Sequence, residues 1–325
     1  KKPQPKFDRT IWTEHLACLS FTTFLLPSMN AIIATTDFSA SSANAVRYAA
    51  AFADATGARL VLFHHFIYPA PATDVPFLQP LVYVDEMSAS HERHLADIRA
   101  ELLKVFPKLD ISTVVRSLSL QEDLEELFHE EEADIVVMGT KAHSPLSSVL
   151  LGSVSSKTIR RGKLPVLLVP ECCSYHTVQK ILFPSDRHYF GNAQILQPLH
   201  DAAKTFSAYV EVLTLGNRDD LSELAAPSAE HGTPTRSNLS LLLGDVQHGF
   251  SYENERDVQA GIVEEAARVQ ADWVAMVPHH HSVFATLFNT SETQRVAGSL
   301  KLPLLVLGER VPHAPEEAEP IDAVL

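Results

Sequence analysis

The sequence predicts an α/β protein built from two tandem, doubly wound, mostly parallel five-stranded sheets. Short apolar runs alternate along the chain with longer segments whose apolar residues recur every three or four positions, and these are the patterns of buried strands and amphipathic helices. Such alternation builds parallel sheets with right-handed crossovers. The plan also occurs twice, because Leu164–Val169 returns as Leu302–Leu307, and the same shift (Pro303 minus Pro165 is 138) places Met276 on Met138. A repeat this regular predicts two domains of one fold.

The first copy is expected to alternate five strands with four helices. The strands are predicted at 31–35, 60–63, 111–116, 135–138 and 166–169. Ser39 or Ser41 can cap the first helix, and Gly57 supplies its end. A loop broken by prolines, 69–80, leads to a long amphipathic helix whose apolar face extends from Met87 to Val105. The later helices are predicted from the capping box Ser119-x-x-Glu122 and from Gly152-Ser153 to Gly162.

The second copy repeats this order after a hydrophilic connection. Lys180–Asp186 copies the first strand together with the aspartate that follows it, and a helix lined by Ile195, Leu199, Ala203 and Phe206 comes next. The remaining segments are a strand at Tyr209–Leu215, a polar stretch at 216–237, an apolar segment at Leu239–Leu243, a helix containing Val258 and Ile262, and strands at Trp273–Val277 and Pro303–Leu307. We therefore expect domains at 29–172 and 173–309, followed by a disordered acidic tail at 310–325.

Residues 1–28 are predicted to be an extension outside the fold. Basic residues precede the apolar run Leu16–Leu26, as in a signal peptide, but Asp8 and Glu14 do not suit one and no clear cleavage site follows. Met29 stands directly before the first strand, so we expect it to be the natural start, with secretion as the alternative. Cys18, Cys172 and Cys173 form no disulfide framework, which favours a reducing, cytoplasmic setting.

Composition narrows the function classes. The chain has 325 residues, of which 46% are hydrophobic and 20% charged, values typical of a soluble globular protein. Its formal net charge of −14 repels nucleic-acid backbones and anionic membrane surfaces, so we expect neither as a partner. A nucleotide is still permitted, because it needs only a local pocket of hydrogen-bond donors.

The most informative segment is Asp134–Pro170. An apolar strand ends at Gly139, and the spacing Gly139-x2-Ala142-x9-Gly152-Ser153 leads into a helix start. Glycine lets the backbone approach an anion closely, and the free N–H groups of a helix's first turn point toward it. The alternative is a strand-to-helix connection in which these glycines serve only as turns.

This spacing resembles the phosphate-binding motif of the universal stress protein family, Gly-x2-Gly-x9-Gly-Ser/Thr, with Ala142 as the one departure. The resemblance covers nearly all of residues 30–308. It implies the adenine nucleotide alpha hydrolase-like fold of that family and an intramolecular pseudo-dimer. In the pseudo-dimer the last strands of the halves, Pro165–Val169 and Pro303–Leu307, meet edge to edge. A homodimer is a further alternative.

The resemblance also implies a ligand, ATP or another adenine nucleotide, with or without Mg²⁺. The adenosine portion maps onto Asp37 and, through its backbone, His65; the phosphates map onto Gly139, Ala142, Gly152, Ser153 and Val154, with Lys141 as an added cation. Two of these have simpler interpretations, because Asp37 can be a helix N-cap and Lys141 a solvated side chain. If the family's glycine at position 142 adopts a positive φ, alanine there costs about 1 kcal/mol.

The second half lacks the motif. The shift of 138 places Val277, His280, Thr290 and Ser291 on the positions of Gly139, Ala142, Gly152 and Ser153. Bulky side chains therefore stand where backbone should meet phosphate, so we expect no nucleotide there although Asp186 is kept. His279–His281 is interpreted as a solvated loop and not as a metal site, because no standard ligand spacing follows.

The leading hypothesis is a stress-response protein that binds ATP in its N-terminal half and acts as a sensor or switch. No catalytic residues are predicted, since the sequence presents no nucleophile with its base, no Walker lysine and no metal triad. Two alternatives stay open. One is a scaffold that binds no nucleotide and serves dimerisation or partner recruitment. The other is a slow ATPase or adenylyl-transferring enzyme.

Overall fold

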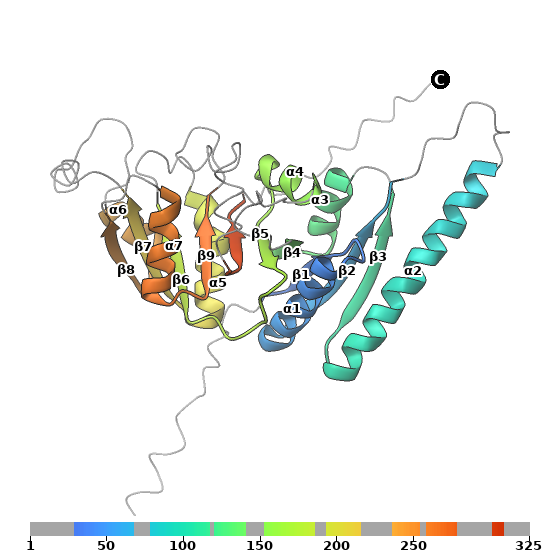
Figure 1. Ribbon diagram of the computed structural model, residues 1–325, viewed down its shortest axis with the longest axis horizontal. Coiled ribbons are helices and arrows are strands. Elements are labelled where there is room, and N and C mark those ends of the chain that lie inside the picture. Colours follow the sequence, from blue (N-terminus) through green and yellow to red (C-terminus); the bar gives the residue numbers. More distant parts are fainter. Residues whose placement is uncertain are drawn as a thin grey trace, which may run out of the picture.

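The computed structural model describes residues 29–67, 79–117, 120–140, 153–185, 193–215, 236–253, 258–277 and 301–308. Residues 1–28, the tail 310–325, Asp186 and His279–His281 lie outside the described residues, so the predictions made for them stay predictions. Figure 1 shows one long sheet with helices packed on both of its faces. The α/β fold class is confirmed.

The first half of the chain supplies five strands and four helices. They are β1 (Ala31–Thr35), α1 (Ala40–Thr56), β2 (Arg59–His65), α2 (Gln79–Val105), β3 (Ile111–Arg116), α3 (Leu120–Glu130), β4 (Ile135–Thr140), α4 (Ser153–Arg161) and β5 (Val166–Pro170). Helix α1 begins where the sequence predicts, because the Ser39 hydroxyl accepts a hydrogen bond from the N–H of Ser42, and it ends at Gly57, whose φ of 72° is left-handed.

The second half repeats much of this order among the described residues. Its elements are β6 (Lys180–Pro184), the 3₁₀ turn η1 (Ala193–Leu196), α5 (Gln197–Phe206), β7 (Tyr209–Leu215), α6 (Arg236–Leu243), β8 (His248–Glu253), α7 (Val258–Val269), β9 (Trp273–Met276) and β10 (Leu304–Val306). The apolar segment Leu239–Leu243 belongs to helix α6, and strand β8 is an element that the sequence analysis does not predict.

The strands form a single ten-stranded sheet in the order β3-β2-β1-β4-β5-β10-β9-β6-β7-β8. Every pair is parallel except the central one, in which β5 and β10 run antiparallel with Leu167 opposite Leu305. The expected meeting of the last two strands is therefore confirmed, and it joins two five-stranded sheets of the same strand order. Pairing these two edges removes exposed backbone groups that would otherwise invite aggregation.

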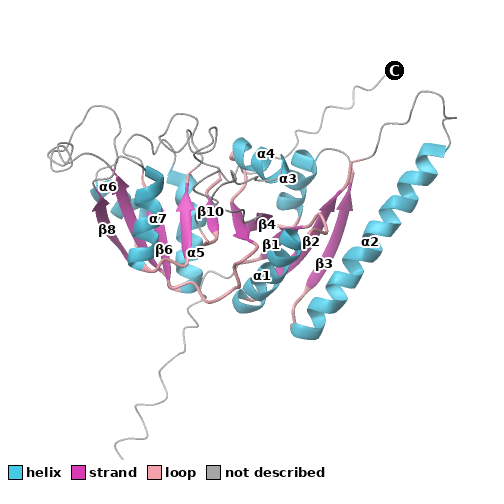
Figure 2. Cartoon of the chain, viewed as in Figure 1, coloured by secondary structure: helices cyan, strands magenta, loops and turns pink. Residues whose placement is uncertain are grey.

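Alternate residues of the strands face two separate cores. One core gathers Ile32, Leu60 and Val137 beneath helices α1, α2, α5 and α6. The other gathers Ile33, Val61 and Val136 beneath helices α3, α4 and α7. Figure 2 shows the resulting three layers of helix, sheet and helix. Among the described residues, no helix is long and apolar enough to cross a bilayer.

Candidate functional site

The strand order reverses between β1 and β4. From β1 the chain proceeds outward through β2 to β3, whereas β4 lies on the other side of β1 and leads to β5. Ala34 of β1 stands directly opposite Val137 of β4. In open α/β sheets ligands bind at the carboxyl ends of the strands beside such a reversal. Asp37 follows the end of β1 and Gly139 lies near the end of β4, so two of the predicted site residues share this edge.

Asp37 lies in a short turn that is organised by hydroxyl groups. Its Oδ1 accepts a hydrogen bond of 3.0 Å from the N–H of Ser39, while Thr36 Oγ1 accepts one of 3.0 Å from the N–H of Phe38. Ser39 is the N-cap of α1, so the alternative that Asp37 caps this helix is wrong. Partial burial raises the pKa of the Asp37 carboxyl, but hydrogen bonds from Ser39 and Ser42 outweigh it, and the pKa lies below its usual value.

Gly139 is fixed by packing. A Cβ atom at this position would lie 2.4 Å from the carbonyl oxygen of Ser41 and 2.9 Å from the N–H nitrogen of Ser42. Any side chain would therefore collide with the backbone in the first turn of α1. This contact explains, without any ligand, why position 139 needs glycine. It also brings the ends of β1 and β4 close together.

The rest of the predicted phosphate loop is described only at its end. Helix α4 begins at Ser153, as the motif predicts, and continues through Val154; the side chains of these two residues are not described. Lys141, Ala142 and Gly152 lie outside the described residues. Their roles in binding a nucleotide stay predictions.

His65, the predicted end of β2, has its side chain on the face of the sheet that α3 covers, opposite to the face covered by α1 and α2. Its Nε2 lies 3.6 Å from Oδ2 of Asp123 on α3, and both side chains are nearly buried. The neighbouring His64 points the other way, because side chains alternate along a strand. Its Nδ1 is 2.8 Å from the carbonyl oxygen of Thr36. His64 is thus the histidine whose side chain contacts the Asp37 turn, and the sequence analysis missed it.

Phe38 and His91 complete the surroundings of this turn. The rings of Phe38 and His64 are centred 4.3 Å apart, and Phe38 stacks on His91 of α2 with an interplanar angle of 8°. Phe38 also has a φ of 62°, a left-handed conformation that is uncommon for a bulky residue. Three elements, β1, β2 and α2, therefore meet at the turn that carries Asp37.

A separate groove of about 530 Å³ lies between α1 and α2. It is lined mainly by apolar side chains, among them Val46, Ile98, Leu102 and Phe106. None of the predicted site residues is among those that line it. The groove is therefore distinct from the strand ends at which the sequence places the ligand.

Comparison with protein families identifies this part of the chain. The model of the universal stress protein family matches residues 29–170, the segment that contains β1 to β5 and the Asp37 turn. Residues 29–170 therefore belong to the universal stress protein family.

Individual proteins also resemble parts of the chain. Universal stress protein G of Shigella flexneri is 38% identical over 82 residues, which are 24% of this chain and 57% of that protein. The chain thus spans little more than half of the length of this curated relative. A universal stress protein from Archaeoglobus fulgidus DSM 4304 shares the fold, with a TM-score of 0.63 at 15% identity over 87% of this chain and 99% of that one. A universal stress protein in complex with cAMP matches 44% of this chain and 97% of its own, with 27% identity and a TM-score of 0.33.

The second half of the sheet differs from the universal stress protein domain at the position of Gly139. Val277, which follows β9, is 8% exposed and packs in the core beneath α1 and α5. A core side chain therefore occupies the place where the first half has a glycine at the strand end. Residues 278–300, which would hold the equivalents of Ala142, Gly152 and Ser153, lie outside the described residues.

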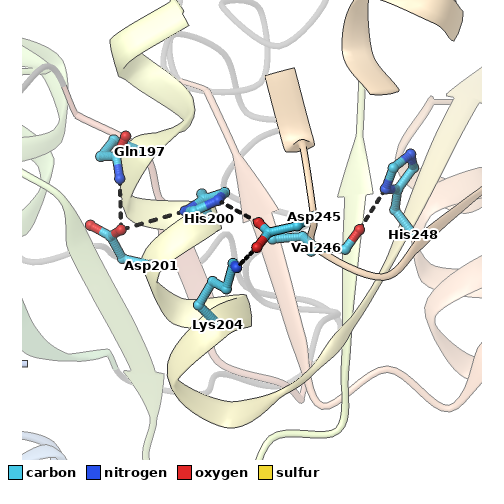
Figure 3. Close-up of polar contacts among 7 residues, drawn as sticks. All are labelled: Gln197, His200, Asp201, Lys204, Asp245, Val246 and His248. Carbon is cyan, nitrogen blue, oxygen red and sulfur yellow. Dashed lines mark hydrogen bonds and ion pairs between the residues drawn. The ribbon is translucent and has the colours of Figure 1, made fainter. Parts of the chain in front are cut away.

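Charged and polar side chains also gather in the second half, between α5 and the turn that joins α6 to β8 (Figure 3). His200 lies 3.6 Å from Asp201 and 3.5 Å from Asp245, and Lys204 pairs with Asp245. Nearby, the Ser240 hydroxyl is 2.7 Å from Nε2 of His248, a serine–histidine pair that sequence analysis missed. Ser240 lies inside α6, and its carbonyl accepts from Gly244, so this pair ties α6 to β8. No group of residues able to hold a metal ion occurs in the described part of the chain.

Proposed function

We propose that the protein binds ATP, or another adenine nucleotide, at the edge of the sheet where β1 and β4 end. The adenosine portion contacts the Asp37 turn and the backbone at the end of β2, and the phosphates lie over the segment between β4 and α4. Bound nucleotide makes the protein a sensor or switch in the stress response of the cytoplasm, with no fast chemistry of its own.

The position of Asp37 carries this proposal. It lies at the reversal of strand order, next to the strand end at which α1 and Gly139 are in contact. Its carboxyl is exposed and has a lowered pKa, so at neutral pH it is an ionised acceptor for the two hydroxyl groups of a ribose.

Donors for the phosphates come from the other side of the reversal. Helix α4 begins at Ser153, and the first N–H groups of a helix have no partner within it. With the positive end of the helix dipole they form an anion site. Lys141 adds a cation by the same proposal, and Mg²⁺, when present, is held by the phosphates and by water.

Isothermal titration of ATP into the purified chain tests the proposal. We expect about one nucleotide per chain, because only the first half carries the motif. Asp37→Ala weakens binding by removing the ribose acceptor, and Gly152→Val abolishes it by placing a side chain against the phosphates. Asp54→Ala is the matched control, since it removes an exposed carboxylate from the far end of α1. Two nucleotides per chain would contradict the proposal for the second half.

A scaffold that binds no nucleotide is the second candidate, and Gly139 favours it. Packing against Ser41 accounts for this glycine without a ligand, and Ala142 departs from the family motif. No heat of binding at millimolar ATP, with the protein folded, would decide for the scaffold. Phosphate release that a single side-chain substitution removes would decide instead for a slow ATPase.

A further inference from the structure

The Asp37 turn, β2 and α2 are joined by three rings that pack against one another. Phe38, His64 and His91, called here the histidine cluster, come from these three elements. Phe38 and His64 are centred 4.3 Å apart, Phe38 and His91 5.9 Å, and His64 and His91 4.5 Å. Phe66 adds a fourth contact, 5.0 Å from His91. The cluster therefore links the position of α2 directly to the turn that carries Asp37.

His64 has a fixed tautomer. A carbonyl oxygen can only accept a hydrogen bond, so the 2.8 Å contact with Thr36 requires the proton on Nδ1. Nε2 of the neutral ring then carries a lone pair. His64 is 6% exposed, and its Nε2 is buried without a hydrogen-bond partner among the described residues. A second proton would therefore create a buried cation with an N–H that lacks an acceptor.

His91 has the same difficulty. Its Nδ1 is buried and has no hydrogen-bond partner among the described residues. Burial lowers the pKa of His91 below its ordinary value of 6.5, and burial likewise lowers the pKa of His64. Two imidazolium rings centred 4.5 Å apart would also repel each other. The cluster keeps this packing only while both rings are neutral.

The charges that face the cluster do not compensate for protonation of both rings. Asp37 in the turn favours protonation of His64, whereas His65 of β2 and His91 oppose it. His94 of α2, whose ring is 5.3 Å from Phe38, opposes protonation of His91. The more distant charges are engaged elsewhere: Asp123 of α3 lies beside His65, and Arg116 of β3 pairs with Glu126 and Glu130.

We propose that the histidine cluster is a proton sensor: in mildly acidic solution His64 and His91 take up protons, α2 separates from the Asp37 turn, and nucleotide affinity falls. The change in affinity rests on the proposed function. The opening of α2 is a property of the protein without ligand and can be measured alone.

The direction of the pH effect follows from proton linkage. In the closed state α2 packs on the Asp37 turn, and in the open state it has separated from the turn. Because the pKa values of His64 and His91 in the closed state lie below the ordinary value of 6.5, the open state binds more protons than the closed state once the pH falls below 6.5. The closed state is therefore fully stabilised above that pH and loses stability as the pH falls from there through the folded pKa values. Because two groups contribute, the loss is steeper than for one histidine.

Hydrogen exchange of the unliganded chain tests the opening. After correction for the intrinsic pH dependence of exchange, we expect residues 86–105 of α2 to exchange about tenfold faster near pH 5.5 than near pH 7.5. Helix α7, which packs on the other face of the second half, is the internal reference. The double variant His64→Asn, His91→Phe should show no such difference, because Asn keeps a donor for Thr36 and Phe keeps the stack.

Controls keep the outcome decisive. His176→Gln removes an exposed histidine outside the cluster and should behave as the wild type. If the double variant fails to fold, His91→Phe alone replaces it, because it leaves the bond between His64 and Thr36 in place. This single variant should show a smaller difference in α2 exchange between the two pH values than the wild type. Equal corrected exchange of α2 at both pH values in the wild type would overturn the proposal.

ATP titration at the same two pH values tests the coupling. We expect the affinity of the wild type to fall about fivefold more than that of the double variant; comparing the two cancels protonation of the phosphates themselves, which occurs near pH 6. Equal falls would overturn the coupling. If ATP binds at neither pH, the proposed function fails, and hydrogen exchange alone then decides whether the cluster senses protons.

Discussion

The indole N–H of Trp273 donates a hydrogen bond of 2.8 Å to the hydroxyl of Tyr48, 225 residues away. Trp273 belongs to β9 of the second half and is fully buried, and Tyr48 belongs to α1 of the first half. Phe52 and Phe206 pack edge-on against the same indole, each with its ring centred 5.6 Å away. The two halves therefore share a core beneath α1 and α5, in addition to the pairing of β5 with β10.

Tyr48→Phe should destabilise the whole chain. The substitution keeps the ring but leaves the buried N–H of Trp273 without its acceptor, which costs about 1–3 kcal/mol. Chemical denaturation followed by circular dichroism measures the loss. Tyr175→Phe is the matched control, because the Tyr175 hydroxyl is buried without a hydrogen-bond partner among the described residues and its removal should be neutral or stabilising. Equal losses in the two variants would contradict the assigned role of the bond.

Gly139→Ala should destabilise the protein in the absence of any nucleotide. The added methyl group meets the Ser41 backbone at 2.4 Å, and such overpacking costs about 1–3 kcal/mol. Thermal unfolding of the unliganded chain gives the measurement. Gly57→Asn should lose less, because the space around Gly57 is open and asparagine tolerates its left-handed conformation. An unchanged melting temperature for Gly139→Ala would mean that α1 can move away.

The strand ends that form the candidate site could be predicted from the sequence, because they depend on short-range patterns. Asp37 and Gly139 each follow an apolar run, and the carboxyl ends of parallel strands share one edge of a sheet. The contact of Gly139 with Ser41 could not be predicted, since it depends on how closely α1 approaches β4. The same glycine therefore fits a phosphate motif and a packing contact, and the sequence does not distinguish them.

His64 shows where sequence reasoning had a usable signal and missed it. Residues of a strand alternate between faces, and His64 shares its face with Leu60 and Leu62, which pack beneath α1 and α2. A histidine on that apolar face predicts a buried side chain near the Asp37 turn. His65 has the opposite parity, and its side chain reaches α3 instead.

Strand β8 gave no comparable signal. It lies at the edge of the sheet and all six of its residues are half-buried, so it lacks the apolar run that marks an inner strand. Helix α2 begins at Gln79, before the predicted Met87. The Pro80 that suggested a loop lies in the helix's first turn, where proline needs no hydrogen-bond partner for its nitrogen.

Alkylation should distinguish the two adjacent cysteines. Cys172 is exposed and Cys173 buried. Burial raises the pKa of the Cys173 thiol to about 12, with Cys172 adding to the effect, and the thiol donates a hydrogen bond of 3.1 Å to the Lys301 carbonyl. Because the thiolate is the nucleophile, iodoacetamide near pH 8 should modify Cys172 about a hundredfold faster. Peptide mass spectrometry measures the two rates; similar rates in the native chain, as expected after denaturation, would contradict the buried position of Cys173.

Asn44 holds the connection between the halves, and its substitution gives a prediction whose sign depends on pH. Its amide nitrogen donates to the carbonyl oxygens of Pro170 and Cys173, at 3.1 and 2.9 Å. Asn44→Ala removes both donors from a half-buried position and should cost about 1–2 kcal/mol. Asn44→Asp should cost more at neutral pH, because a carboxylate then faces two carbonyl oxygens.

Acid should partly restore the Asn44→Asp variant. The two carbonyl oxygens and partial burial favour the protonated carboxyl, so its pKa is higher in the folded than in the unfolded chain. The folded state then binds more protons, and its stability relative to the wild type rises as the pH falls through the folded pKa toward the unfolded value of about 4. Denaturation midpoints of wild type, Asn44→Ala and Asn44→Asp across this range measure the effect. A deficit that stays constant with pH for Asn44→Asp, as expected for Asn44→Ala, would show that the introduced carboxyl turns to solvent and that the connection does not depend on this amide.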